Sequence, residues 1–185
     1  AGFVGDLNNM ESSYIFKEFF DRTLDVDNYE SRSSNYFIDD SKRENYIFNS
    51  SINGIEESDL IFLIGSNPRF ESTILNARIR KSFINNNTKI ISLTNEGDLT
   101  YPYQALNGQT QTIADIFEGH NDISKEILNS KKPLIILGES FFKLKSANYM
   151  FQLIKKFLKE NDKISGEWNS LNKLNTDASN VGSLD

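Results

Sequence analysis

The chain has 185 residues, of which 38% are hydrophobic, so it is long enough to bury a core without disulfides or a structural metal. Its formal net charge of −6 argues against a nucleic-acid-binding domain, because such domains usually carry a basic excess. It has no cysteine and one histidine, His120, which excludes cysteine-ligated metals and thiol nucleophiles and nearly excludes a histidine-based metal site or catalytic triad.

The amino-terminal residues, AGFVGD, are typical of the end of a β-strand, although no turn precedes them. We therefore expect the chain to be an excerpt of a longer protein. This stretch has neither the basic nor the apolar segment of a signal peptide. No apolar run in the chain approaches the roughly 20 residues that a membrane-spanning helix needs.

Residues 8–24, NNMESSYIFKEFFDRTL, predict a helix, because their apolar residues recur near helical spacing. Asn8 or Asn9 can cap its first turn. The following stretch, 25–53, is polar and lacks periodicity, so we expect a long loop with at most one short strand, around Tyr36–Ile38. A loop of this length inside a domain often carries function or contacts another part of the protein.

The clearest strand is predicted at 57–65, ESDLIFLIG, where a continuous apolar run indicates a strand covered on both faces. The polar turn that follows can cap a helix running from Pro68 to about Asn85. A second strand is predicted at 89–93, KIISL, so the two strands should be parallel. The apolar stripe expected on the intervening helix comprises Ile74, Leu75, Ile79 and Phe83.

The second half of the chain repeats this alternation of strands and helices. DLTYPYQAL, 98–106, is interpreted as a connection, and two short helices are predicted at 110–119 and 122–130. A third apolar strand lies within KKPLIILGES, 131–140, and a long helix is predicted from about residue 140 to 161. The stripe expected on that helix comprises Phe142, Ala147, Met150, Phe151, Ile154 and Leu158.

This alternation predicts an α/β protein with an open, mainly parallel sheet and helices on both faces. We count three parallel strands and a truncated one at the amino terminus. Residues 1–161 are predicted to form this domain. Residues 162–185 are predicted to form an irregular tail that packs on the domain through Trp168, Leu171 and Leu174.

In open parallel sheets, ligands bind beyond the carboxyl ends of the strands. The turns at Gly5–Asp6, Gly65–Asn67 and Gly138–Ser140 should all lie on that edge. The second turn opens a helix with free N–H groups and an arginine nearby, an arrangement that can hold a pyrophosphate. The chain contains neither GxGxxG nor GxxxxGK[ST], and such turns more often only reverse the chain. The candidate cofactor-binding residues are Gly65, Ser66, Asn67 and Arg69.

Other charged residues admit both a functional and a structural interpretation. Arg78 and Lys81, three apart on the predicted helix, share a face that could bind an anion. We favour a solvated face, or one that forms ion pairs with another domain. The carboxylates of Glu56, Glu57 and Asp59, close to the start of a strand, are expected to be solvated.

Asp98 and Tyr101 fall in a loop at the predicted ligand edge, where they could be polar site residues. A turn role is favoured for Asp98. His120, between two short helices, is expected at the surface or as a cap. Spacing and chemistry therefore predict no catalytic residue and no metal ligand.

The stretch SDLIFLIGSNPRFESTILNARIRKSF, 58–83, resembles the molybdopterin-oxidoreductase-like domain in the large iron–sulfur subunit of respiratory complex I. Similar stretches include GDLNNMESSYIFKEFF, DLTYPYQALN, KKPLIILGES and WNSLNKLNTDASNVGSLD, so the resemblance covers most of the chain. Ser66 departs from the family's usual threonine. The residues that match the family's pattern are Glu56, Asp59, Gly65, Asn67, Pro68, Arg69, Glu71, Asn76, Ala77, Arg78, Ile79, Arg80 and Lys81.

The resemblance implies a formate dehydrogenase/DMSO reductase-like domain that is part of NADH–quinone oxidoreductase, in its electron-transfer arm. It implies iron–sulfur clusters held by cysteines in an N-terminal region outside this chain, and no cofactor within it. The implied partners are other subunits of complex I, without nucleic acid or direct membrane insertion. The implied location is peripheral, on the cytoplasmic side of a bacterial inner membrane or the matrix side of the mitochondrial inner membrane.

Two functions remain open at this point. In the first, the domain is a degenerate cofactor-binding fold that serves as a scaffold in the electron-transfer arm. In the alternative, it belongs to a molybdopterin-dependent oxidoreductase and still binds a pterin guanine dinucleotide near Gly65, Ser66, Asn67 and Arg69.

Overall fold

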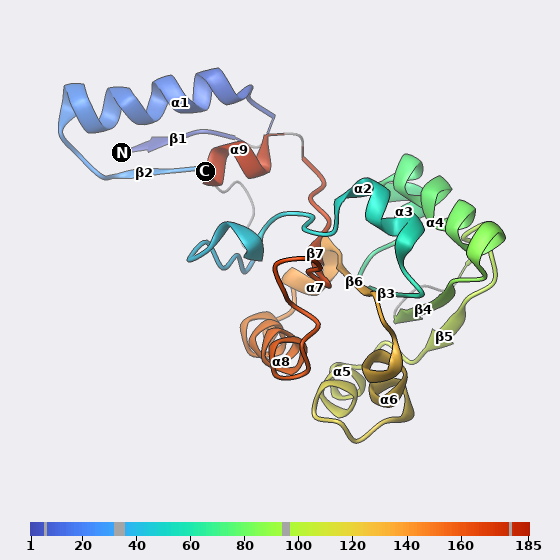
Figure 1. Ribbon diagram of the computed structural model, residues 1–185. Helices are drawn as coiled ribbons and strands as arrows, with labels where there is room; N and C mark the ends of the chain where they lie inside the picture. Colours follow the sequence, from blue (N-terminus) through green and yellow to red (C-terminus); the bar gives the residue numbers. More distant parts are fainter. Residues whose placement is uncertain (6, 32–35, 94–96, 178) are drawn as a thin grey trace. The chain divides into compact units, whose positions relative to one another are not determined.

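The computed structural model describes residues 1–5, 7–31, 36–93, 97–177 and 179–185. The chain divides into two compact units (Figure 1). Unit 1 comprises Ala1–Tyr36 and Asn175–Asp185, and unit 2 comprises Phe37–Leu174. The division of the chain into domains at residue 161 stays a prediction.

Unit 2 is built on a five-stranded sheet with the order β5-β4-β3-β6-β7 (Figure 1). All four neighbouring pairs are parallel, and Leu60 is in register with both Lys89 and Pro133. The three predicted strands are therefore confirmed, at the centre of the sheet. The strands are β3 (Leu60–Ile64), β4 (Lys89–Leu93), β5 (Gln104–Leu106), β6 (Pro133–Leu137) and β7 (Leu171–Lys173).

One face of this sheet is covered by α4 (Thr73–Asn86). Leu75 and Ile79 of the helix are buried in one cluster with Ile61 and Leu63 of β3. Side chains of a strand alternate between its two faces, so every second residue of the apolar run points toward α4. This packing explains why the run needed no polar residue on either side.

The opposite face of the sheet is covered by helices of the second half of the chain. Phe62 of β3 stacks on Phe117 of α5 (Thr110–Phe117), with ring centroids 6.3 Å apart. Phe117 in turn meets Phe157 of α8 (Ala147–Glu160) edge-on at 5.5 Å. The sheet thus has helices on both faces, as the sequence predicted. The remaining helix of this half is α6 (Asp122–Asn129).

The helix predicted from Pro68 is interrupted. It consists of α3 (Pro68–Glu71) and α4, separated by Ser72, whose backbone is not helical, with φ of −155° and ψ of 74°. The short helix α3 is held at the sheet edge by hydrogen bonds from Ser66 and Asn67 to Glu71, whereas α4 lies on the sheet face. Ile74, predicted to belong to the buried stripe, is exposed, because it falls on the side of α4 that faces away from the sheet.

The long helix predicted over 140–161 is also interrupted. It consists of α7 (Glu139–Phe142) and α8, and its expected apolar stripe is buried throughout. The Phe142 carbonyl accepts a hydrogen bond from the N–H of Phe37 at 3.1 Å, which replaces the bond that would continue the helix. The strand predicted around Tyr36–Ile38 is wrong for the same reason, since this segment meets a helix end and not a strand.

Two short strands of unit 2 lie in segments that were predicted to be irregular. β5 is an edge strand in the 98–106 connection, with Gln104 and Ala105 exposed. β7 lies in the expected tail, where Trp168, Leu171 and Leu174 do pack on the core as predicted. β7 was missed because its sequence, LNK, has no apolar pattern even though all three residues are buried.

Unit 1 contains the predicted amino-terminal helix, α1 (Met10–Glu18), capped by Asn9 through a 2.9 Å bond from Ser12 N–H. A π-helical turn, Phe19–Leu24, extends it. Within this unit the aromatic rings of Phe16, Phe20 and Tyr29 pack against one another. Its strands are β1 (Gly2–Phe3) and β2 (Tyr29–Glu30), and its last helix is α9 (Asn180–Leu184).

The truncated amino-terminal strand is confirmed, but it does not belong to the main sheet. β1 pairs in parallel with β2 in a separate two-stranded sheet. The turn at Gly5–Asp6 therefore does not follow a strand of the main sheet, and its position at the ligand edge stays a prediction. Asp6 itself lies outside the described residues.

Three further short helical segments, in unit 2, are Arg43–Asn45, α2 (Ser51–Gly54) and Ile55–Glu57.

Candidate functional site

The turns after β3 and β6 meet at the carboxyl edge of the sheet, as predicted. Gly65 has a φ of +63°, and a Cβ atom there would lie 2.5 Å from the backbone nitrogen of Phe141. A Cβ atom on Gly138 would lie 2.3 Å from the Gly65 carbonyl oxygen. Both distances are below any real contact of a Cβ atom, so the two turns need glycine because they pack directly on each other. This packing leaves no room for a ligand group between them.

The polar groups of the first turn are bound by a carboxylate of the same chain. Glu71 Oε1 accepts a hydrogen bond from the Asn67 backbone N–H at 3.1 Å. Glu71 Oε2 accepts another from the Ser66 hydroxyl at 3.2 Å. The carboxylate thus lies at the turn that could hold a pyrophosphate, and it repels a second anion. One atom is not satisfied in this way: Asn67 Oδ1 is buried and has no hydrogen-bond partner among the described residues.

Arg69, the fourth candidate residue, points to the loop after β4. Its Nη1 atom donates to the Asp98 carbonyl at 2.5 Å and pairs with Asp98 Oδ2 at 2.8 Å. Asp98 Oδ1 accepts from the Thr100 N–H at 2.7 Å, which confirms the predicted turn role. The Thr100 N–H, followed by the Arg69 guanidinium, lowers the pKa of Asp98.

Tyr101 is a buried structural residue. Its hydroxyl donates to Asn76 Oδ1 at 2.8 Å, and Asn76 Nδ2 donates to the Leu99 carbonyl at 3.0 Å. Burial raises the pKa of the Tyr101 hydroxyl well above its usual range, so it stays protonated. Asn76 therefore fastens the loop of Leu99 and Tyr101 to α4, and the hydroxyl is not available to a substrate.

Two of the three basic residues of α4, Arg78 and Lys81, form ion pairs within the chain. Glu56 pairs with Arg78, and with Lys81 at 2.7 Å. Lys81, and then Arg78, lowers the pKa of Glu56. The prediction that Arg78 and Lys81 share a face is confirmed. The prediction that Glu56 is only solvated is wrong, because the chain folds its carboxylate back between the two cations.

Asp59 has a similar structural task at the opposite edge of the sheet. It accepts hydrogen bonds from the Ser130 hydroxyl and from the backbone N–H groups of Lys131 and Lys132, at 2.7 and 3.0 Å. Burial alone would raise the pKa of Asp59, but these bonds outweigh it and lower the pKa. The expectation that Asp59 is only solvated is therefore wrong. Glu57 pairs with Lys132 at 2.5 Å on the exposed surface.

His120 lies at the surface, as predicted. Its side chain is 70% exposed, and its Nδ1 atom is 3.6 Å from Glu118 Oε2. Among the described residues, no group of three or more His, Cys, Asp or Glu side chains is placed to hold a metal ion. The histidine therefore receives no catalytic or metal-binding assignment.

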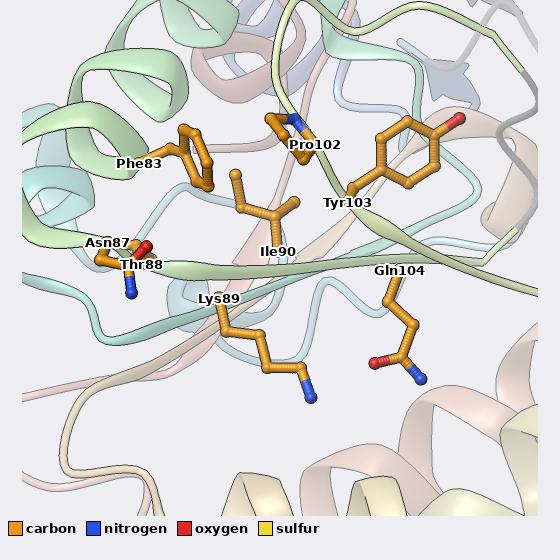
Figure 2. A pocket seen from close by; sticks show the side chains of 8 residues that line it. All are labelled: Phe83, Asn87, Thr88, Lys89, Ile90, Pro102, Tyr103 and Gln104. Carbon is orange, nitrogen blue, oxygen red and sulfur yellow. The ribbon is translucent and has the colours of Figure 1, made fainter.

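Sequence reasoning missed a pocket of about 470 Å³ where the end of α4 meets β4 and β5 (Figure 2). Its apolar wall comes from Phe83, Ile90 and Pro102, which cluster on one side of the strands in Figure 2. Lys89 points away from that wall, and its ammonium group pairs with Glu126 at 2.5 Å. The wall offers no nucleophile or general base, so the pocket carries no catalytic assignment. The full lining is Phe83, Asn87, Thr88, Lys89, Ile90, Pro102, Tyr103 and Gln104.

None of the helices in the described part of the chain combines the length and the apolar character needed to cross a membrane.

Comparison with known proteins accounts for the whole chain. The family model of molybdopterin oxidoreductase matches residues 1–185. The NADH-ubiquinone oxidoreductase 75 kDa subunit of Reclinomonas americana is 35% identical over 197 residues, covering 100% of this chain and 28% of the relative. The mitochondrial NADH-ubiquinone oxidoreductase 78 kDa subunit of Candida albicans is 38% identical over 144 residues, covering 77% of this chain and 20% of the relative.

A third relative, the mitochondrial NADH dehydrogenase [ubiquinone] iron-sulfur protein 1 of Solanum tuberosum, is 30% identical over 185 residues, covering 100% of this chain and 25% of the relative. The chain thus spans between 20% and 28% of the length of these relatives. The match over all 185 residues agrees with the parallel sheet and with the motif around the turn after β3. The chain belongs to the molybdopterin oxidoreductase family.

Proposed function

We propose that the chain is part of a subunit of NADH–ubiquinone oxidoreductase, respiratory complex I, in which the molybdopterin-oxidoreductase fold serves as a scaffold in the electron-transfer arm. The names of the relatives support the assignment to that enzyme. One observation supports the scaffold role above all: the Glu71 carboxylate binds the Asn67 N–H and the Ser66 hydroxyl, the groups that a cofactor phosphate would need.

Gly65, Ser66, Asn67 and Arg69 are proposed as a vestigial cofactor site. They do not fit the pyrophosphate of a molybdopterin guanine dinucleotide. A phosphate at the turn would meet the negative charge of Glu71, and Arg69 is already bound to Asp98 at 2.8 Å. Tight packing of Gly65 on Phe141 closes the remaining approach between the two turns.

The remaining parts of the proposal concern the surroundings of the domain. Its partners are other subunits of complex I, which agrees with relatives that are themselves named as subunits. One relative is named an iron–sulfur protein, and this chain has no cysteine, so any clusters are held by residues outside it. We place the domain peripherally, on the matrix side of the mitochondrial inner membrane or the cytoplasmic side of a bacterial one.

One observation favours the alternative function, a domain that still binds a pterin guanine dinucleotide. Asn67 Oδ1 is buried at the candidate site without a hydrogen-bond partner among the described residues. Such an acceptor could receive a hydrogen bond from a guanine amino group. Two observations weigh against this alternative: Glu71 already binds the Ser66 hydroxyl, and Arg69 is already paired with Asp98.

The test is metal and pterin analysis of the protein purified in its full length from its native source. We expect the protein to co-purify with NADH dehydrogenase activity and to contain molybdenum and tungsten far below one atom per chain. A molybdopterin enzyme such as a formate dehydrogenase, carried through the same purification, controls for loss of cofactor. Stoichiometric metal together with an extractable pterin would replace the scaffold role with the alternative.

A further inference from the structure

The helix α4 carries apolar side chains on its outer side as well as on the side that packs on the sheet. Leu75 and Ile79 are buried against the sheet. Ile74 and Ile84, on the outer side, are 77% and 62% exposed. The outer side of α4 therefore carries two exposed isoleucines besides its polar residues.

The preceding helix α3 also exposes a large apolar side chain. Phe70 is 81% exposed, and Ser72 separates α3 from α4. Ala77 is exposed and lies between Ile74 and Ile84 in helical spacing. We call the exposed residues Phe70, Ile74, Ala77, Arg80, Lys81 and Ile84 the outer α4 face. Scattered apolar side chains need no explanation, but a contiguous group of them marks an interaction site.

Charge gives the outer α4 face its specificity. The segment 68–86 carries four cations, and three of them form ion pairs within the chain: Arg69 with Asp98, and Arg78 and Lys81 with the single carboxylate of Glu56. Arg80 is exposed and has no ion-pair partner among the described residues. The sequence of α4 contains no aspartate or glutamate. Arg80 is therefore the one cation of this segment without an ion pair among the described residues, and its helical neighbours Ala77 and Ile84 are exposed.

We propose that the outer α4 face docks a separate protein chain that presents a carboxylate flanked by apolar side chains. Aromatic residues and arginine are enriched at protein–protein interfaces, whereas lysine and glutamate are depleted, and Phe70 and Arg80 fit that composition. The acidic partner group follows from charge complementarity with Arg80. This inference rests on the proposed function, because the partner is taken to be another subunit of the same complex.

A second copy of this chain is a poor occupant of the same surface. In a symmetric dimer, both copies present the same patch, so two unneutralised Arg80 side chains would be buried together. The nearest carboxylate along the chain, Glu71, already binds Ser66 and Asn67. A separate acidic partner avoids this repulsion and neutralises Arg80.

The first test measures incorporation of the full-length protein into the complex. Arg80→Glu and Ile74→Asp are compared with Lys145→Glu, an exposed charge reversal in the loop between α7 and α8. The amount of protein that migrates with NADH dehydrogenase activity on native gels is the readout. We expect each outer-face variant to lower incorporation at least about 10-fold, and the control to leave it unchanged. Equal incorporation of all three would overturn the proposal.

The second test identifies the partner group directly. Arg80→Lys introduces an amine that a carbodiimide can join to a carboxylate in direct contact, and mass spectrometry then identifies the joined peptide. A bond to a carboxylate of a different protein chain supports the proposal. A bond within the same chain, a bond between two copies distinguished by isotope labelling, or the absence of any bond overturns it.

The two tests also separate this inference from the proposed function. If the wild-type protein does not migrate with NADH dehydrogenase activity, the proposed function fails. A cross-link from position 80 to a carboxylate of another chain would still support the docking surface in that case. Urea unfolding of each variant, with a midpoint equal to that of the wild type, shows that the substitutions act at the surface.

Discussion

Asn76 illustrates how a single side chain of the family motif is used in this fold. It lies on α4 and is buried. Its Nδ2 and Oδ1 atoms both form hydrogen bonds with the loop after β4. Arg69 contacts the same loop through Asp98, and Glu71 binds back to the turn from which α3 starts. At the scale of residues, these motif side chains bind to the chain itself, and this explains their identity without a ligand.

Replacing Asn76 by alanine should destabilise the protein by about 1–3 kcal/mol. The Tyr101 hydroxyl and the Leu99 carbonyl would lose their partner while buried, and unmade buried hydrogen bonds carry that penalty. The free energy of unfolding in urea measures it, and a double-mutant cycle with Tyr101→Phe should give a coupling energy of about 0.5–3 kcal/mol.

The control for that experiment is Asn85→Ala, an exposed asparagine of the same helix. Exposed substitutions of this kind change stability by no more than about 0.5 kcal/mol. If Asn76→Ala and Asn85→Ala destabilised the protein equally, the hydrogen bonds of Asn76 would not be what holds the loop.

At the scale of elements, the start of the two central strands is set by one carboxylate. Asp59 immediately precedes β3, and it binds the backbone of Lys131 and Lys132, which immediately precede β6. The first residues of the strands, Leu60 and Pro133, are in register. The side chain therefore aligns two strands that are more than 70 residues apart along the chain.

Asp59→Asn should lower the free energy of unfolding at pH 7 by about 1–2 kcal/mol, because hydrogen bonds to a charged acceptor are stronger than those to an amide. The pKa of Asp59 is lowered in the folded protein from its ordinary value of 3.8. Its stabilising effect is therefore fully present above pH 3.8 and is lost as the pH falls through the lower, folded-state pKa.

Urea unfolding at several pH values between 7 and the acid limit of folding checks this prediction. The difference between the wild type and Asp59→Asn should narrow as the pH falls below 3.8. Glu57→Gln, which removes an exposed ion pair with Lys132, serves as a control with an expected change of about 0–1 kcal/mol. A difference that stayed constant down to the lowest pH would show that the charge of Asp59 is not what stabilises the strands.

At the scale of the whole molecule, the two units differ in how much apolar surface they bury. All five residues of β3 and all five of β6 are buried in unit 2. Among the described residues of unit 1, the buried apolar side chains are Val4 and Phe20. Because stability against local opening follows buried apolar contacts, the units should not open with the same free energy.

Native-state hydrogen exchange measures this difference. Backbone amides of β3 and β6 should show the highest free energies of opening, and those of α1 and β1 clearly lower ones. Rates corrected for intrinsic exchange remove the effect of local sequence. Equal protection in α1 and in β3 would mean that the small core of unit 1 is as stable as the sheet.

The sequence by itself determined the elements whose signal is local. Continuous apolar runs predicted β3 and β6, and helical spacing predicted α1. The sequence also predicted β4, α5 and α6. It also placed the turns after β3 and β6 on one edge of a parallel sheet, because strands joined through helices run in the same direction. The family motif around Gly65 could also be recognised from the sequence, because its residues are contiguous.

Only the tertiary structure decided what those residues contact. β7 is buried although its sequence is polar, because Asn172 exchanges hydrogen bonds with Ser50 at 2.8 and 3.0 Å. The bond between Phe37 and Phe142 ends a helix that periodicity alone would continue. Glu71 binds the polar groups of the turn that could have held a pyrophosphate. Each of these three contacts depends either on groups that are distant in sequence or on the direction of one side chain. The spacing of residues along a short stretch of sequence specifies neither of these.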